Sequence, residues 1–293
     1  MRMSGSPYSE EGVVKTGAEV RLTVATATMN AVSTGRAAGL EHCIRSVAAL
    51  PFPHEHLVRD GASRDGAGEV LLRLARDVQG LKVSSAPDGG VYDALNGALA
   101  AACGEWFLVL GDDDAIIDPA MLAEVLEGAS ANGSDIAAAP VDIGGGRLLV
   151  ARPGLVLGGM GCPHQGMLVR TSVLREIGGF EAKYRIAGDY DMFLRLILRG
   201  ARLSRFERPF SRFSFGTGLS GDTDAGAAEV AEALTAAFGL TEAERTFRLR
   251  NRVLPLRRSL RFLCHRSPFV RESARWQIAK RLAQVFGIQG GGR

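Results

Sequence analysis

Acidic side chains gather where apolar runs of the chain give way to polar loops. The most acidic of these loops is Asp112-Asp113-Asp114, which follows the apolar run WFLVL of residues 106–110. Adjacent carboxylates on a turn can supply hard oxygen ligands to Mg²⁺ or Mn²⁺, while water and phosphate oxygens fill the remaining positions. The plain alternative is a solvated turn ahead of a helix that Asp118 caps. The position directly after a buried strand favours the metal site.

The elements that must carry these loops alternate between strands and helices. Apolar runs rich in β-branched residues predict strands at 20–27, 56–59, 81–85 and 106–110. Helical spacing of apolar residues predicts helices at about 38–50, 69–77 and 92–102. This alternation favours an α/β fold with an open, mostly parallel sheet flanked by helices.

Ligands of such sheets bind at the carboxyl ends of the strands. The polar loops 28–30, 60–65, 88–93 and 112–114 all fall at that edge. Their carboxylates would repel one another unless a cation or the donors of a ligand compensate the charge. The sequence therefore predicts a ligand site at this edge of the sheet.

The second half of the chain is less regular. Helices are predicted at 118–131, 172–177 and 189–199, and strands at 136–141 and 168–170. Residues 204–215 are expected to form a further pair of strands. The helix 189–199 (DYDMFLRLILR) is amphipathic, and Asp189 stands at its start, where a carboxylate can cap backbone N–H groups.

Composition and missing motifs exclude several classes of protein. The 293 residues are 46% hydrophobic and 23% charged, unlike a collagen or a disordered chain. No glycine-rich dinucleotide motif follows the first strand, and no phosphate-binding P-loop occurs. The four cysteines form no C-x-x-C pair, and His42, His54 and His56 show no ligand spacing, so the three histidines are expected at the surface.

Targeting signals are also missing from the sequence. The N-terminal stretch lacks the apolar core of a signal peptide, and no segment reads as a transmembrane helix. We therefore expect a cytoplasmic location, and residues 1–19 are interpreted as a disordered leader.

Five segments, taken in order, resemble the family 2 glycosyltransferases with a GT-A fold. They are TVATATMNAV, VRDGASRDG, APDGGVYDALNGALAAACGEWFLVLGDDD, PHQGMLVRTSVLREIGGFEAKYRIAGDYDMFLRL and FSFGTGLS. Within the family the chain looks most like bacterial enzymes that build exopolysaccharide repeat units, such as colanic-acid transferases, and glycolipids. The resemblance implies a GT-A domain at 20–222, followed by a basic helical extension at 223–293.

The resemblance also implies roles for individual residues in binding a sugar nucleotide. Asp60 would contact its base or ribose, and Thr26, Ala27 and Thr28 would line the base. The residues implied to border the nucleotide or the sugar are Asp88, Tyr92, Asp93, Asn96 and Asp113. Asp114 is the first choice and Asp112 the second for holding Mn²⁺ or Mg²⁺ against the diphosphate.

The same resemblance implies a general base. Asp189 matches the second acid of the "ED" motif of the family, with Asp191 and His164 in support. A histidine satisfied within the core is an equal reading of His164. Three positions depart from the family pattern: Ala86 replaces a common Glu, Gly188 replaces the first acid of "ED", and Gly216-Thr217-Gly218 replaces a Gly-Gly pair.

An inverting, metal-dependent transfer of a sugar from a nucleotide donor, UDP-linked by preference, is the implied reaction. The acceptor would be a hydroxyl of a saccharide or of a lipid-linked sugar. The main rival is a polyprenyl-phosphate sugar synthase, whose phosphate nucleophile needs no general base. A non-catalytic nucleotide-sugar-binding or scaffold protein is the alternative from another class.

The C-terminal tail carries a charge of its own. Residues 245–293 hold 13 Lys and Arg against Glu272 alone, a charge of +12, which leaves −9 for residues 1–244 because the whole chain carries +3. Leu249, Val253, Leu256, Leu260 and Leu263 recur at helical spacing, apart from the arginines. This pattern predicts an interfacial helix that binds anionic lipid on the inner face of the cell membrane. A solvated helix packed on the body is the alternative, and the lack of an RNA-binding motif disfavours a nucleic-acid partner.

Overall fold

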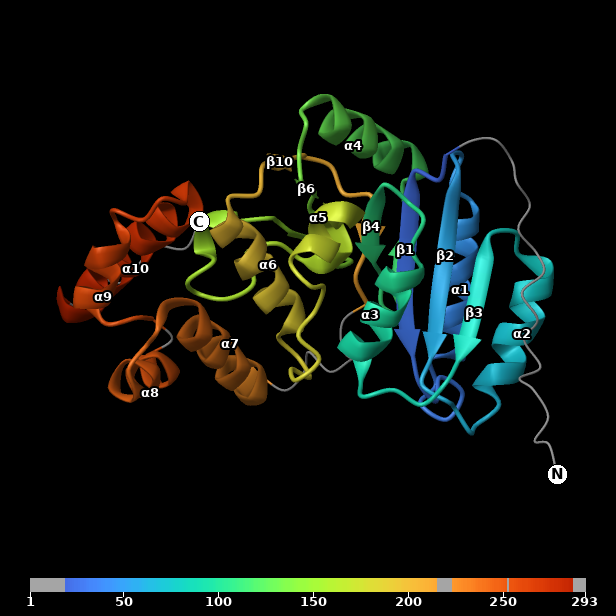
Figure 1. The fold of residues 1–293 in the computed structure, drawn as a ribbon, viewed down its shortest axis with the longest axis horizontal. Coiled ribbons are helices and arrows are strands. Elements are labelled where there is room, and N and C mark those ends of the chain that lie inside the picture. Colours follow the sequence, from blue (N-terminus) through green and yellow to red (C-terminus); the bar gives the residue numbers. More distant parts are fainter. Residues whose placement is uncertain (1–18, 215–222, 252, 287–293) are drawn as a thin grey trace.

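A mixed sheet forms the centre of the fold. The computed structural model describes residues 19–214, 223–251 and 253–286. Within these ranges the large sheet has seven strands in the order β10-β6-β9-β4-β1-β2-β3 (Figure 1). Their bounds are β1 Leu22–Thr28, β2 His54–Asp60, β3 Leu81–Ser85, β4 Trp106–Val109, β6 Ile136–Ala138, β9 Met167–Arg170 and β10 Leu203–Arg205. β9 runs antiparallel to both neighbours, β4 and β6, and the other pairs are parallel.

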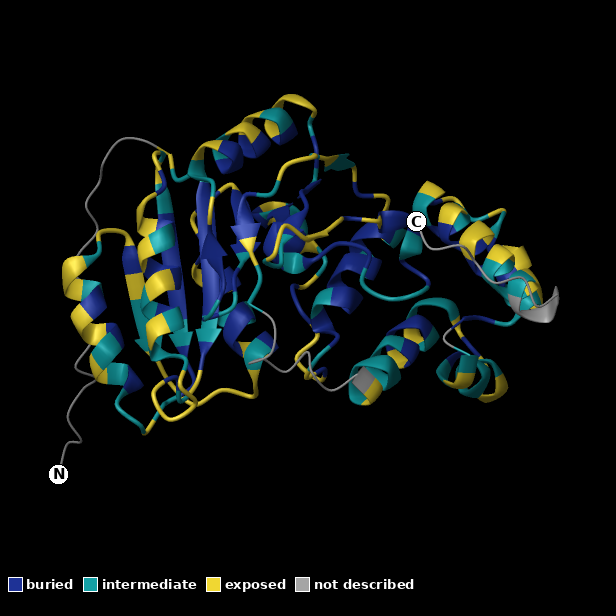
Figure 2. Ribbon diagram, turned by 180° about the vertical axis from the view of Figure 1, so that it is seen from behind, coloured by how far each residue is buried: buried dark blue, intermediate teal, exposed yellow. Residues whose placement is uncertain are grey.

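The central strands are buried on both faces (Figure 2). Successive side chains of a strand point to opposite faces, and β4 is apolar on each, while β1 adds buried threonines to its apolar residues. In β4, Trp106 and Leu108 pack on one face with residues of α1 and α4, whereas Phe107 packs on the other with α3 and α6. Helices on both faces therefore explain why WFLV is an unbroken apolar run rather than an alternating one.

Two layers of helices cover the sheet. The first layer holds α1 Ala37–Ala48, α2 Ala67–Asp77 and α4 Pro119–Ala131, and the second holds α3 Val91–Ala101, α5 Thr171–Glu176 and α6 Gly188–Arg199. The side chain of Asp118 accepts a hydrogen bond of 2.9 Å from the N–H of Met121, and Pro119 takes the first helical position, so α4 begins where the sequence indicates.

A second, smaller sheet lies beyond the central strands. It joins β5 Ala115–Ile116, β11 Ser211–Arg212, β7 Val141–Asp142 and β8 Leu148–Leu149, and two short 3₁₀ turns, η1 Pro153–Leu155 and η2 His164–Gly166, follow. The expected strand pair at 204–215 is wrong, because β10 pairs with β6 in the large sheet and β11 joins the small one. The expected strand 136–141 is divided into β6 and β7 at Pro140, which has no N–H to donate.

Four helices form the C-terminal part of the described chain: α7 Thr223–Phe238, α8 Glu242–Asn251, α9 Leu256–Phe262 and α10 Pro268–Phe286. The residues 249–263 of the predicted interfacial helix are divided between α8 and α9, as expected of Pro255, which can start or kink a helix. α8 ends at Asn251, Val253 and Leu254 are fully buried, and α9 starts directly after Pro255. None of the helices within the described ranges has the length and apolar character to cross a bilayer.

Contacts with the body hold this extension in place. The Arg248 guanidinium donates to the carbonyl of Gly158, and the N–H of Leu157 donates to the hydroxyl of Ser273. α7 packs beside α6. These four helices lie at the end of the fold away from α2 (Figure 1). The described residues on either side of the boundary predicted at 222 therefore share an interface. That boundary and almost all of the leader expected at 1–19 lie outside the described residues.

A buried carboxylate ties the three strands at one side of the sheet together. Glu55 of β2 accepts hydrogen bonds from the Thr23 hydroxyl, the Cys103 N–H and the Lys82 ammonium, all at 2.6–2.7 Å. Burial alone would raise the pKa of Glu55, but these hydrogen bonds and the Lys82 charge hold it below its usual value of 4.5. The group therefore stabilises the fold above pH 4.5, and this contribution is lost as pH falls through the lowered pKa.

Replacing Glu55 by Ala should lower the free energy of unfolding by about 1–3 kcal/mol at pH 7, because the buried Thr23 hydroxyl and the Cys103 N–H lose their acceptor. Urea unfolding measures the change. The control is Glu41→Ala, which removes a surface pair with Arg45 and should cost under about 1 kcal/mol. A Glu55→Ala penalty that equals the control, or that does not shrink in acid, would contradict this account.

Candidate active site

The parallel register brings polar side chains to one edge of the sheet. Thr28 of β1 lies beside Asp60 of β2, and Asp60 lies beside Ser85 of β3. The arrowheads of these three strands point to the same edge in Figure 1. Loops that are far apart in the sequence therefore meet where the sequence predicted a ligand site.

Asp112 is held by a cation of the chain itself. Its carboxylate accepts from the Thr28 hydroxyl at 2.6 Å and from one Arg36 nitrogen at 2.6 and 2.7 Å. Burial raises its pKa despite these two partners, and the neighbouring Asp113 adds to the rise. Arg36 was not singled out from the sequence. In this arrangement the Asp112 carboxylate forms an ion pair with Arg36.

The buried Asp114 side chain bonds back to the residue that precedes the acidic turn. Its carboxylate accepts from the N–H of Gly111 at 2.8 Å and from the N–H of Ser214 at 3.2 Å, and the side chain is 1% exposed. Burial raises the pKa of this carboxyl, while the charge of His164 lowers it. Asp113 is half-buried, and its carbonyl accepts from the Ser214 hydroxyl.

These carboxylates suit a divalent ion that relies on a ligand for most of its coordination. Among the described residues, no three His, Cys, Asp or Glu side chains form a metal-binding group. Mg²⁺ usually needs only one or two protein carboxylates when phosphate oxygens and water complete its shell. Each Asp114 oxygen has a lone pair left after its N–H bond, and a cation would offset its buried charge. Asp114 therefore fits this role, whereas the charge of Asp112 is already paired with Arg36.

The residues implied to bind the nucleotide lie in different environments. Asp60 is buried, and its carboxylate accepts from the hydroxyls of Ser63 and Ser85. Asp88 and Asp93 are exposed, and each accepts from a backbone N–H of the Gly89-Gly90 turn. Asp88 lies across from Gly61, where an added Cβ would come within 3.1 Å of its Oδ2. The β2 and β3 loops therefore meet.

The Thr26 side chain is not exposed to a ligand at this edge. It is fully buried, and its hydroxyl lies 3.0 Å from Nε2 of His56. The expectation that His56 is a surface residue is wrong, since burial lowers the pKa of its ring to about 3, helped by His54. His56 is buried because it belongs to β2, which begins at His54, two residues earlier than predicted.

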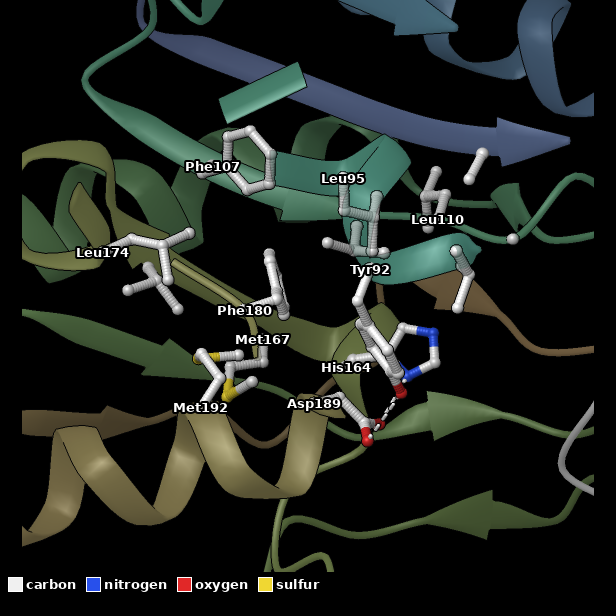
Figure 3. Close-up of a pocket in the computed structure, with 15 residues that line it drawn as sticks. Tyr92, Leu95, Phe107, Leu110, His164, Met167, Leu174, Phe180, Asp189 and Met192 are labelled. Carbon is white, nitrogen blue, oxygen red and sulfur yellow. Dashed lines mark hydrogen bonds and ion pairs between the residues drawn. The ribbon is translucent and has the colours of Figure 1, made fainter. Parts of the chain in front are cut away.

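Asp189 lies at the centre of a second polar group. Its Oδ2 is 3.1 Å from Nδ1 of His164, and the Tyr92 hydroxyl lies 3.4 Å from Oδ1 (Figure 3). The N–H of Tyr190 donates to Oδ1 at 2.7 Å. Burial alone would lower the pKa of His164, but the hydrogen bond and charge of Asp189, with the charge of Asp114, raise it above 6.5. The two carboxylates therefore act on one imidazole.

A cavity of about 100 Å³ lies beside Asp189. Asp189 and His164 line it, and so does Gly111, which directly precedes the acidic turn and donates its N–H to Asp114. Its deeper wall is apolar, with Phe107, Leu174 and Met192 among the lining side chains (Figure 3). Such a mixture of apolar walls and a few polar groups is typical of small-molecule sites.

Gly188 has a steric reason to lack a side chain. An added Cβ would approach the Tyr92 ring within 2.7 Å, a contact that neither group can relieve by a small rotation. The Tyr92 ring in turn stacks on Phe180, with centroids 5.8 Å apart. Asn96 exchanges two hydrogen bonds with the backbone of Phe180. Asn96 therefore fixes the position of the aromatic pair, and nothing in the structure brings it to the cavity.

Asp191 lies away from Asp189 and the cavity. It is buried, and its carboxylate accepts at 2.7 Å from Nε of Arg195. The same guanidinium donates to the carbonyls of Ile177 and Gly179. The structure therefore gives Asp191 a place in fixing the turn before Phe180, and it does not bring this residue to the polar group of Asp189.

Comparison with known proteins identifies the family. The model of glycosyl transferase family 2 matches residues 23–185, which is more than half of the chain. The chain belongs to this family. The matched residues contain the acidic turn and His164, and they end four residues before Asp189.

Curated relatives of this family 2 chain come from mycobacteria. An uncharacterized glycosyltransferase of Mycobacterium tuberculosis is 31% identical over 171 residues, 55% of this chain and 64% of that protein. A PGL/p-HBAD biosynthesis glycosyltransferase of Mycobacterium bovis is 28% identical over 182 residues, 58% of this chain and 69% of that protein. The match thus spans less than two thirds of the first relative.

Solved structures share the fold over almost the whole chain. Residues 1–349 of S. aureus TarS, in complex with UDP-GlcNAc, align with a TM-score of 0.62 and 18% identity over 93% of each chain. The mannosyltransferase PcManGT from Pyrobaculum calidifontis, in complex with GDP-Man and Mn²⁺, aligns with a TM-score of 0.60 and 18% identity over 94% of this chain and 77% of that chain. The GT-A fold predicted from the sequence is confirmed.

Replacing Asp189 by Asn should lower the pKa of His164, because the charge that holds its proton is removed. NMR titration of the His164 ring measures this pKa. The matched control is Asp191→Asn, which removes a carboxylate two residues along the same helix and should leave the titration unchanged. Equal pKa values in wild type and Asp189→Asn would contradict the pairing of these two side chains.

Proposed function

We propose that this chain is an inverting glycosyltransferase with Asp189 as the general base. The observation that carries the proposal is the Asp189 carboxylate, one fifth exposed and paired with His164, on the wall of a cavity that Gly111, the residue directly before the acidic turn, also lines. The acceptor hydroxyl would attack the anomeric carbon of a nucleotide sugar while Asp189 takes its proton, a role worth typically 10²- to 10⁴-fold in rate.

The neighbours of Asp189 hold it ready for this step. Tyr92 donates to the carbonyl of Ile186 at 2.7 Å, so its hydroxyl is fixed beside Oδ1 of Asp189. His164 restrains the other carboxylate oxygen. After proton transfer, a charged His164 would favour the ionised form of Asp189 and so the return of the base to its active state.

The leaving group is a nucleoside diphosphate. A divalent cation, Mn²⁺ or Mg²⁺, held by Asp114 would act as a Lewis acid toward the diphosphate oxygens. Asp113, half-buried next to Asp114, would contribute to binding the donor. The Mn²⁺ in the complex of PcManGT supports this choice of cofactor.

A UDP-linked donor and an acceptor from cell-surface polysaccharide or glycolipid synthesis complete the proposal. UDP-GlcNAc is the ligand of TarS, and GDP-Man is that of PcManGT. The name of the PGL/p-HBAD biosynthesis relative supports a lipid-linked or saccharide acceptor. A polyprenyl-phosphate sugar synthase would need no base at 189, and a non-catalytic protein would bind a nucleotide without turning it over.

The test combines binding with turnover. UDP- and GDP-sugars are screened with Mn²⁺ by thermal shift, and release of nucleoside diphosphate is then measured for each donor that binds. Asp114→Ala should lose the Mn²⁺-dependent rise in melting temperature. Asp189→Asn should keep that rise and lose about 10²- to 10⁴-fold in kcat.

The control variant for this test is Asp142→Asn, which alters a surface pair with Arg212 in the small sheet. It should keep both binding and turnover. Full turnover by Asp189→Asn would favour the phosphate nucleophile of a synthase, and binding without turnover by the wild type would favour a scaffold.

We also propose that the C-terminal helices adsorb to the anionic inner face of the cell membrane. Support comes from the +12 charge of residues 245–293 and from Leu260, Trp276 and Leu282, which are 38–48% exposed on α9 and α10. An exposed apolar side chain among cations is the combination that interfacial helices use.

Vesicles with 30% phosphatidylglycerol should cosediment with the protein, and Leu260→Ser should weaken this binding by about tenfold, since one leucine loses its burial in lipid. The control is Leu72→Ser, on α2 at the far end of the fold, where a leucine is 44% exposed. Equal losses for the two variants, or binding to neutral vesicles alone, would argue for a tail that packs only on the body.

A further inference from the structure

The turn that leads into α6 needs an acceptor that α6 itself does not supply. The first N–H groups of a helix have no partner within it. Ala187 occupies the N-cap position of α6 and offers no side chain for capping. Of the first-turn carboxylates, Asp189 accepts from the N–H of Tyr190 and lies beside His164, whereas Asp191 pairs with Arg195. The N–H groups of residues 185–187, which precede α6, therefore need another acceptor.

Glu229 of α7 supplies that acceptor from another part of the chain. Its Oε1 accepts from the N–H of Arg185 at 3.0 Å, and its Oε2 accepts from the N–H groups of Ile186 and Ala187, both at 2.8 Å. Three successive backbone donors thus converge on one half-buried carboxylate. A negative charge at this end of α6 is also favoured by the helix dipole.

The same turn is held from the opposite side by the Tyr92 hydroxyl. Tyr92 donates to the Ile186 carbonyl, whereas Glu229 accepts from the Ile186 N–H. α7 lies close against this residue, because a Cβ added to Gly226 would come within 3.3 Å of Ile186 Cγ2. The start of α7 lies beside the loop that enters α6 in Figure 1. The turn is therefore fixed between α3 and α7.

We propose that Glu229 is a positioning residue for Asp189, through which the C-terminal extension completes the active site. It touches no cavity-lining group itself and acts through the Arg185–Ala187 backbone, two residues before Asp189. Its part in catalysis rests on the proposed function of Asp189. Its part in holding the turn does not. Both Glu229 and α7 lie outside the residues 23–185 that the family model matches.

The chain offers a matched control on the same helix. Glu232 lies three residues further along α7, and its carboxylate pairs with Lys183 at 2.8 Å on the surface. Glu232→Ala removes the same number of atoms and the same charge from α7. It leaves the three hydrogen bonds to the turn in place.

Two readouts follow the turn without any substrate. In Glu229→Ala, the amide exchange of Arg185, Ile186 and Ala187 should speed up by at least about tenfold, because their common acceptor is gone. The pKa of His164 should fall toward its ordinary value as Asp189 leaves its place beside the ring. Glu232→Ala should change neither quantity.

Turnover is measured with whichever nucleotide sugar the wild type hydrolyses or transfers. Glu229→Ala should lower kcat by about 10- to 100-fold and leave the KM for the donor within about twofold, as expected for a displaced base. Glu229→Gln keeps one carbonyl oxygen facing the turn and should recover part of the loss. If Glu229→Ala unfolds, the Gln variant carries the same comparison.

Amide exchange and kcat equal to those of Glu232→Ala would overturn the proposal. So would a Gln variant no better than Ala, or a loss confined to KM. Asp189→Asn separates the two hypotheses. If that variant keeps full turnover while Glu229→Ala still frees the turn, the base assignment fails and only the catalytic consequence of Glu229 falls with it.

Discussion

Negative charge buried at one edge of a sheet is the constraint on which this structure depends. The parallel strands end with their polar loops together, and carboxylates cannot approach one another in a buried place without compensation. The chain solves this at each carboxylate in a different way: Arg36 for Asp112, backbone N–H groups for Asp114, two serines for Asp60 and His164 for Asp189. Of these four carboxylates, Asp60 and Asp114 accept hydrogen bonds from uncharged groups. An added cation would offset the buried charge of Asp114.

Rigid elements hold these groups at fixed distances. β1 pairs with both β2 and β4, so the sheet fixes the Thr28 hydroxyl relative to the start of the acidic turn. Asp189 lies on α6, whose position relative to the sheet depends on the Tyr92 and Phe180 rings. The cavity lies between these two parts of the fold, and Gly111 and His164 line it. Its shape therefore depends on contacts of α3 and α6 as much as on the polar residues themselves.

The sequence predicted the sheet well because local patterns carry that information. Four apolar runs followed by polar loops are enough to place β1 to β4 and the acidic turn. The partners of the carboxylates could not be predicted, because Arg36 and Glu229 are ordinary surface types in the sequence and meet their targets only through tertiary contacts. His56 was misplaced for the same reason: nothing in its neighbours distinguishes a buried strand position. The tail was predicted only in part: Val253 fits the helical repeat but is fully buried between α8 and α9, next to Leu254, whose N–H donates to Gln277.

The contact between Gly188 and the ring of Tyr92 links two positions nearly a hundred residues apart in the chain. A side chain at 188 would need the volume that the ring now fills. In this chain an acid at 188 would therefore require the Tyr92 ring to move, and with it the hydroxyl that lies beside Asp189. The departure from the "ED" motif thus leaves room for an aromatic ring next to the Asp189 carboxylate.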